Sequence, residues 1–179
     1  MCQTTEAGMS EDQRTEPQNP RRPRPETLKK QTDPRMHSAE HILNQTMDRM
    51  FGCGRCFSAH IERKKSKCDY HFGRDLSAEE VGGIQARVNQ IVQDNLVVTE
   101  SFVSREEAVR LYNTEKLPAD VDGQVRIVHM GDYDACPCIG DHVTSTAEIG
   151  GFRITTTSFE NDVLRIRFKL SAPEKGAVV

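Results

Sequence analysis

His37-Ser38-Ala39-Glu40-His41 opens the segment around which the rest of the sequence is organised. Apolar residues recur after this stretch at helical spacing, namely Ile42, Leu43, Met47, Met50 and Phe51. Because residues i and i+4 lie one above the other on one face of a helix, the two imidazoles can bind the same metal ion. The pair supplies only half of a metal site, so the other ligands must come from elsewhere in the chain.

The composition favours one ordinary domain with a tail, because 179 residues with 36% hydrophobic content can bury a real core. The 24 basic and 27 acidic residues give a net charge of −3, which leaves only local contacts for an RNA partner. No apolar run approaches the roughly 20 residues that cross a bilayer, and the N-terminus lacks the apolar core of a secretory signal. We therefore expect a cytoplasmic protein without membrane contact, whose six cysteines are thiols or metal ligands rather than disulfides.

The domain boundaries follow from composition. Residues 1–33 are rich in proline and almost free of large apolar side chains, so they cannot bury enough surface to offset the entropy of ordering. We expect a disordered tail over 1–33, a folded domain over 34–172 and a flexible C-terminus over 173–179.

Local patterns predict an α+β fold with a mostly antiparallel sheet and helices packed on one side. Asp33-Pro34 is a typical helix start. Helical spacing or capping residues mark three segments: 34–51, 76–95 and 105–112. Strand patterns mark six: 56–62, 67–72, 96–103, 123–130, 151–157 and 163–170. The basic turn Arg63-Lys64-Lys65-Ser66 joins the first two strands, and Glu160-Asn161-Asp162 turns the last two into a hairpin.

The second half of a metal site lies in Ala135-Cys136-Pro137-Cys138-Ile139-Gly140-Asp141-His142. Thiolate and imidazole are the usual zinc ligands, and a catalytic zinc keeps a position for water or substrate. Cys138 and His142 would complete a set with His37 and His41, although Cys136 can replace Cys138 on spacing alone. Cys53-Gly54-Arg55-Cys56, with His60 nearby, is a competing zinc or redox pair, or simply a glycine-rich helix terminus with two thiols.

Taken together, these pieces resemble the editing domain of alanyl-tRNA synthetases and its free-standing relatives, the AlaX proteins. The first family motif, H-T-A-x-H-L-L, is similar to residues 37–43, and the second, C-x-G-x-H-V followed by T-x-E-I-G, is similar to 138–143 and 146–150. Between them, 69–72 and 88–91 are similar to the family's D-F strand and V-N-x-x-I helix. The resemblance runs from about residue 35 to 170 and favours the short, stand-alone form. The related threonyl-tRNA synthetase domain shares both metal motifs, but the Glu148-Ile149-Gly150 continuation favours the alanine type.

The resemblance implies a zinc-dependent deacylase that hydrolyses mischarged aminoacyl-tRNA, with Ser- or Gly-tRNA(Ala) as the expected substrate. His37, His41, Cys138 and His142 are then the expected zinc ligands. Four further residues are candidates for catalysis or substrate contact: Ser38, Glu40, His60 and Asp69. Ser38 can bond a substrate hydroxyl or simply lie on the helix surface, whereas His60 and Asp69 can position water or only satisfy the hairpin. Glu148 can orient a ligand imidazole or end a strand.

Two alternatives remain open. His37-Ser38-Ala39-Glu40-His41 also fits H-x-x-E-H, the inverted zinc-peptidase signature with glutamate as general base, but such peptidases need a larger fold and a downstream glutamate ligand. The second alternative is a non-catalytic tRNA-binding or regulatory module. Contacts to tRNA are expected from four cations, with the tail as a further source: Arg63, Lys64, Lys65 and Lys67. Asp141 replaces a threonine of the family pattern, which leaves the substrate amino acid open, as the sequence also leaves open a monomer or homodimer.

Overall fold

The computed structural model describes residues 33–114 and 123–173, which fall within one unit spanning Thr32–Val179. The predicted tail over 1–33 and the predicted C-terminal segment over 173–179 lie almost entirely outside the described residues. The proposed domain boundaries therefore stay a prediction. Within the described residues, none of the helices has the length and apolar character of a membrane span.

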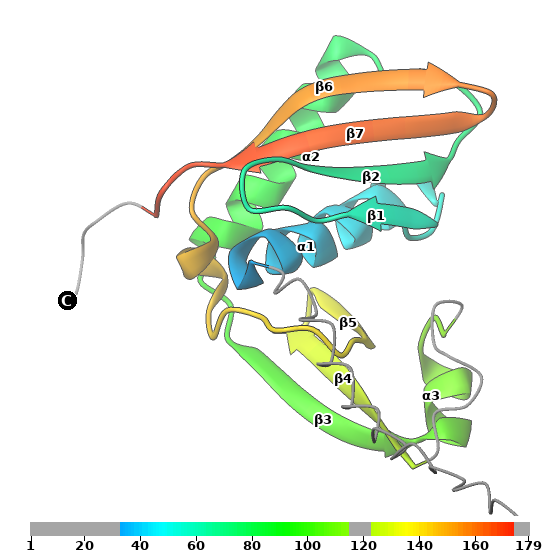
Figure 1. Ribbon diagram of the computed structural model, residues 1–179, viewed down its shortest axis with the longest axis vertical. Helices are drawn as coiled ribbons and strands as arrows, with labels where there is room; N and C mark the ends of the chain where they lie inside the picture. The colour runs from blue at the N-terminus through cyan, green and yellow to red at the C-terminus, as the bar shows by residue number, and fades with distance from the viewer. Residues whose placement is uncertain (1–32, 115–122, 174–179) are drawn as a thin grey trace, which may run out of the picture. The chain divides into compact units, whose positions relative to one another are not determined.

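The elements follow one another along the chain as shown in Figure 1. They are α1 Pro34–Phe51, β1 Ser58–His60, β2 Ser66–His71, α2 Ala78–Gln93, β3 Val98–Ser104, α3 Arg105–Leu111, β4 Gln124–Met130, β5 Asp134–Pro137, the 3₁₀ helix η1 Thr146–Ile149, β6 Phe152–Glu160 and β7 Val163–Leu170. One sheet has four strands in the order β1-β2-β7-β6 and the other has three in the order β3-β4-β5, all paired antiparallel. The predicted α+β, antiparallel class is confirmed, with the strands divided between two sheets.

The capping residues at the two ends of helix α1 explain where it begins and ends. The Asp33 side chain accepts a hydrogen bond from the Arg35 backbone N–H at 3.0 Å, and Pro34 occupies the first turn, where it leaves no donor unsatisfied. At the other end, Gly52 adopts a left-handed φ of 62° and donates its N–H to the Asp48 carbonyl. The predicted bounds 34–51 match the observed helix.

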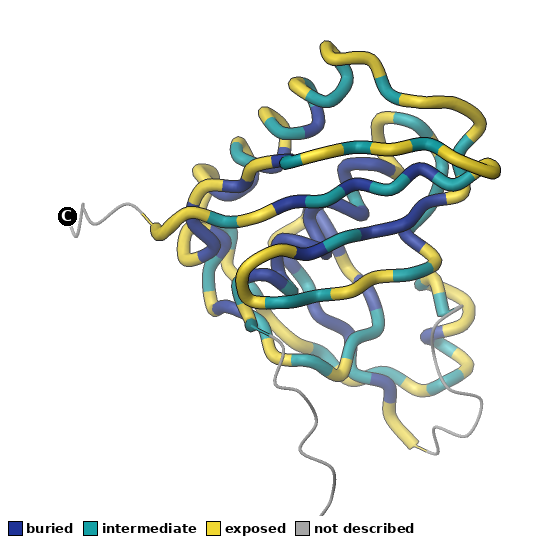
Figure 2. The backbone as a smooth tube through the Cα atoms, turned by 45° about the horizontal axis from the view of Figure 1, so that its top comes forward, coloured by how far each residue is buried: buried dark blue, intermediate teal, exposed yellow. Residues whose placement is uncertain are grey.

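The main core lies between the four-stranded sheet and the two helices α1 and α2, which cover one of its faces (Figures 1 and 2). Strand β7 shows why the sheet has two different faces, because Leu164, Ile166 and Phe168 are buried and alternate with Arg165 and Arg167. A smaller core lies between Ala108 of α3 and Val125 and Ile127 of β4.

The last hairpin confirms the predicted turn. Asn161 and Asp162 adopt positive φ values of 49° and 59°, the conformation that a tight hairpin of this hand requires and that these two residue types tolerate. The first hairpin is confirmed too, although β1 is shorter than the predicted 56–62.

Strand β5 is absent from the sequence prediction, and it positions the loop that follows it. Residues 134–137 pair with β4, so that Cys136 lies opposite Val128 and the chain leaves the sheet at Cys138. Four residues with a proline carry no alternation of their own, so this strand forms only because β4 offers an edge.

Candidate metal centre

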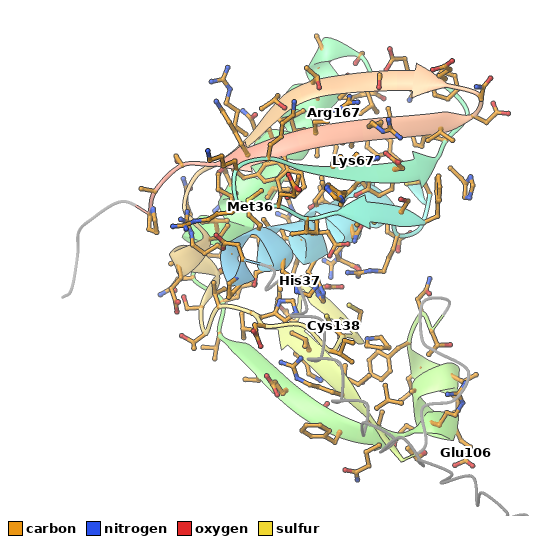
Figure 3. All side chains as sticks on the ribbon, viewed as in Figure 1. Met36, His37, Lys67, Glu106, Cys138 and Arg167 are labelled. Atoms are coloured by element: carbon orange, nitrogen blue, oxygen red, sulfur yellow. The ribbon has the colours of Figure 1, made fainter. Side chains whose placement is uncertain are left out.

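Four side chains from two distant segments meet beside the first turns of α1. His37 and His41 project from the helix, and Cys138 and His142 come from the loop after β5; their ligand atoms all lie within 4.8 Å of one another. We call these four residues the ligand cluster. Figure 3 shows His37 and Cys138 side by side between α1 and the end of β5.

The spacing within the ligand cluster fits a tetrahedral ion. The Nε2 atoms of His37 and His142 each lie 3.4 Å from Sγ of Cys138. Bonds of about 2.3 Å to sulfur and about 2.0–2.1 Å to nitrogen at a tetrahedral angle would place the two ligand atoms about 3.5 Å apart. Within residues 33–114 and 123–173, the buried Nδ1 atom of His37 has no hydrogen-bond partner. The observed separations are therefore those of a zinc-sized site.

The electrostatics of the ligand cluster favour a thiolate. Burial raises the pKa of the Cys138 thiol, but hydrogen bonds with His142, His37 and His41 outweigh it and bring the pKa to about 3. Burial is also the main reason why the pKa of His142 is lowered, which keeps its imidazole neutral. A thiolate and neutral imidazoles are the forms that bind a metal.

Gly140 allows the loop to approach the helix. A Cβ atom at this position would lie 2.5 Å from Nδ1 of His37, closer than real Cβ contacts occur. Arg126 on β4 holds the same loop from the other side, donating from Nη1 to the carbonyl oxygens of Cys138 at 3.0 Å and Gly140 at 2.8 Å. Arg126 itself pairs with Glu100. The thiolate is thus held by backbone packing and by an arginine clamp.

A buried ion pair holds His41. Its Nδ1 lies 3.3 Å from the Asp134 carboxylate, which Arg55 binds through both guanidinium branches at 2.7 and 3.2 Å. Burial disfavours imidazolium, but the hydrogen bonds with Asp134, Cys136 and Cys138 raise the pKa of His41. A carboxylate on one ring nitrogen fixes the ring so that the other nitrogen can face a metal. Cys136, 3.3 Å from Nδ1 of His41, belongs to a separate group with His41 and Asp134.

Ser38 supports His142. Its side chain is fully buried, and Oγ accepts the Val143 backbone N–H at 3.2 Å and shares a hydrogen bond with Nδ1 of His142 at 3.1 Å. The hydroxyl is therefore engaged inside the protein, and contact with a substrate hydroxyl stays a prediction.

Glu40 points to a different part of the interior. It forms a buried group with Cys56 and Cys68, which we call the Glu40 cluster. The Asn44 amide donates to its carboxylate at 2.5 Å and the Cys56 thiol does so at 3.5 Å. Asn44 in turn accepts from the Tyr70 hydroxyl at 2.9 Å. The structure does not bring Glu40 into the ligand cluster.

The two candidates on the first hairpin also lie away from the ligand cluster. His60 is exposed and pairs with Glu62 at 3.1 Å. Asp69 is itself buried, yet strand parity places its carboxylate on the face opposite Cys68 and Tyr70, where Arg165 binds it at 2.7 and 2.8 Å. The cations Arg63, Lys64 and Lys65 are exposed in the β1–β2 turn, and Lys67 follows on β2.

The two cysteines of the competing pair, Cys53 and Cys56, have different partners. Cys53 bonds to the carbonyl oxygens of Met47 and Gly54, whereas Cys56 is in the Glu40 cluster. Glu148 lies on η1, bonded to Thr144. Arg55, Arg126 and Asp134 are not predicted by the motifs, because Arg55 and Arg126 lie far from the ligands in the sequence and Asp134 lies outside the segment Cys138–His142. The available signal for Asp134 was its position, four residues before Cys138.

Comparison with known proteins agrees with the motifs. Residues 125–167 match the family described as "Threonyl and Alanyl tRNA synthetase second additional domain". The chain is 32% identical over 129 residues to an alanine–tRNA ligase of Rickettsia massiliae, which covers 68% of this chain and 14% of the ligase. It is also 32% identical over 126 residues to an alanine–tRNA ligase of Coxiella burnetii, covering 69% and 14%. The chain thus spans about 14% of the length of these curated relatives. The predicted resemblance is confirmed.

Proposed function

We propose, on the premise that this chain carries the second additional domain of threonyl- and alanyl-tRNA synthetases, that it is a trans-editing hydrolase. Its substrate would be mischarged aminoacyl-tRNA, with Ser- or Gly-tRNA(Ala) as the first candidates, and its cofactor zinc. The observation that carries the proposal is the ligand cluster, in which residues 101 positions apart bring an imidazole and a thiolate to 3.4 Å.

In this proposal the residues that hold the four ligands in place also contribute to the reaction. Zinc at the ligand cluster would supply Lewis-acid polarisation of the ester or a water of lowered pKa. Asp134 keeps His41 oriented, Ser38 does the same for His142, and Arg126 keeps the Cys138 loop closed against α1. The aminoacyl ester would approach from the side of the exposed loop residues Ile139 and Asp141.

The tRNA would contact the exposed β1–β2 turn through Arg63, Lys64, Lys65 and Lys67. Phosphate contacts of this kind position a nucleic acid without reading its sequence. Since the proposed substrate is an intermediate of translation, the protein would act in the cytoplasm and contribute to translation fidelity.

Deacylation assays with purified protein test the proposal. Bound zinc is measured first, and hydrolysis of Ser-tRNA(Ala), Gly-tRNA(Ala) and Ser-tRNA(Thr) is then followed for the native chain and for His41→Ala and Cys138→Ala. We expect zinc-dependent release of serine or glycine by the native chain only. Zinc retention by both variants would contradict the assigned ligands, and tRNA binding without hydrolysis would favour a non-catalytic module.

The zinc-peptidase alternative has less support. It requires Glu40 as general base beside the metal, yet this carboxylate accepts hydrogen bonds from Asn44 and Cys56 in the Glu40 cluster. Peptide cleavage without deacylation in the same preparation would reverse this preference.

A further inference from the structure

The outer face of the four-stranded sheet carries a group of cations at one end. Arg153 on β6, Arg167 and Lys169 on β7 and Lys67 on β2 each alternate with buried neighbours and so project away from α1 and α2. We call these four residues the basic sheet face. Figure 3 shows Lys67 and Arg167 on the adjacent strands β2 and β7.

The strand register brings like charges together on this face. Lys67 lies directly opposite Arg167, and Arg153 lies directly opposite Lys169. Directly opposed like charges destabilise an antiparallel pair, whereas threonine or an opposite charge would stabilise it. Two such pairs in a chain of net charge −3 therefore work against folding stability.

Among the described residues, Asp69 is the one internal anion that pairs with a member of the group. Lys67 lies 3.6 Å from Asp69, but that carboxylate is bound by Arg165 as well. Across residues 33–114 and 123–173, the side chains of Arg153, Arg167 and Lys169 have neither an ion pair nor a hydrogen bond. The face thus holds unpaired positive charge for an external anion.

The basic sheet face lies next to the metal-bearing end of α1. Arg35, two residues before His37, donates to the Ile149 carbonyl at 2.9 Å and to the Ser171 carbonyl, two residues after Lys169. Figure 1 accordingly shows the start of α1 and the end of β7 at the same end of the sheet. The exposed turn 63–65 leads into β2 at this end as well.

We propose that the basic sheet face binds the phosphate backbone of the tRNA whose aminoacyl end enters the ligand cluster. This inference rests on the proposed function for its choice of RNA. Two of the four cations are arginines, whose planar guanidinium suits phosphate. A lipid surface fits less well, because the large exposed hydrophobic residues in the described chain lie outside β2, β6 and β7.

Binding of an uncharged tRNA(Ala) transcript at several salt concentrations tests the inference independently of hydrolysis. The variant R153Q/K169Q is compared with the matched control R87Q/R110Q, which removes two exposed cations from α2 and α3. We expect about tenfold weaker binding for R153Q/K169Q. Its log–log salt slope should be smaller by about 2, because each removed cation leaves one phosphate no longer neutralised. The control should bind as the native chain does.

Equal binding by R153Q/K169Q and the native chain would overturn the inference. So would loss of binding to phosphatidylserine vesicles with unchanged tRNA binding, which would assign the face to a lipid surface. Bound zinc and the thermal midpoint should not fall in R153Q/K169Q, since the substitution relieves charge repulsion; a fall in either would mean that the weaker binding reflects damage to the fold. Weaker tRNA binding in a protein that hydrolyses no aminoacyl-tRNA would leave this inference standing while the proposed function fails.

Discussion

Helix α1 contributes to two polar groups, the buried Glu40 cluster and the largely half-buried ligand cluster, which differ in how their atoms are satisfied. In the Glu40 cluster, donors and acceptors are matched, since Asn44 donates to the carboxylate and accepts the Tyr70 hydroxyl. In the ligand cluster, ring nitrogens converge on one thiolate, and Nδ1 of His37 has no hydrogen-bond partner among the residues that the structure describes. Buried polar groups are nearly always hydrogen-bonded.

The difference indicates a structural role for one group and a metal-binding role for the other. The Glu40 cluster joins α1 to neighbouring elements through hydrogen bonds that are already complete, whereas the converging ligand atoms of the ligand cluster can bind a cation. Residue type alone would not distinguish the two, because both groups combine cysteine with a titratable residue of α1.

The largest effect is expected from removing the thiolate. Cys138→Ala should abolish zinc binding and lower deacylation by on the order of a thousandfold, because the tetrahedral set loses its only anionic ligand. Metal analysis and single-turnover hydrolysis measure both. The matched control is Cys136→Ala, which should keep its zinc. Equal zinc content and equal hydrolysis rates in the two variants would contradict the assignment of Cys138 as the ligand.

Asn44→Ala should act on stability instead. It removes the Asn44 partner of the Tyr70 hydroxyl, of the Cys56 N–H and of the Glu40 carboxylate, which keeps the Cys56 thiol as a donor; the cost should be about 3 kcal/mol in the free energy of unfolding. Urea denaturation measures this loss, and the zinc content of the folded fraction should not change. The exposed amide variant Gln90→Ala should cost less than about 0.5 kcal/mol. A zinc-free but stable Asn44→Ala protein would contradict the comparison.

Ser38→Ala should weaken zinc binding about tenfold, because His142 loses the hydroxyl that orients its ring. Competition with a chelator measures the affinity. Ser38→Thr, which keeps the hydroxyl, should restore it. Equal affinity in the alanine and threonine variants would show that packing, not the hydrogen bond, positions His142.

The smallest effect concerns an exposed pair at the start of α2. Arg74, together with the Ser77 backbone N–H, lowers the pKa of Glu80 from its ordinary 4.5 to about 2. Since the folded pKa is the lower one, this stabilisation is complete above about pH 4.5 and is lost as the pH falls toward 2. Unfolding of the native chain between about pH 5 and 3 should therefore depend more steeply on pH than that of Glu80→Gln, and parallel curves would rule out the contribution.

The sequence predicts what is encoded locally. Helix α1 follows from Asp33, Pro34 and the spacing of its apolar residues, and the last hairpin follows from Asn161 and Asp162. The two metal motifs also predict the side chains that the structure brings together, apart from the choice between Cys136 and Cys138, which spacing leaves open.

The rest depends on contacts between distant segments. Strand β5 exists through pairing with β4, and Arg55 reaches Asp134 across 79 residues. A role for Asp69 in positioning water at the ligand cluster does not take account of strand parity, which directs its carboxylate to the opposite face of the sheet from Cys68 and Tyr70. Glu40 points in a different direction around α1 from the two histidines. Which elements contact each face of the helix depends on tertiary packing, which the local sequence does not encode.

The hydrogen bonds of Arg35 have a consequence for the order of events during synthesis. Arg35 reaches the carbonyl of Ser171, 136 residues later, and Cys138 follows His37 by 101 residues. At about 5–20 residues per second, a ribosome exposes the two histidines about 5–20 seconds before the thiolate that faces them. A nascent chain therefore passes through an interval in which α1 is made but its partners are not. Full coordination can begin only after Cys138 and His142 have emerged, and the closing strand follows them.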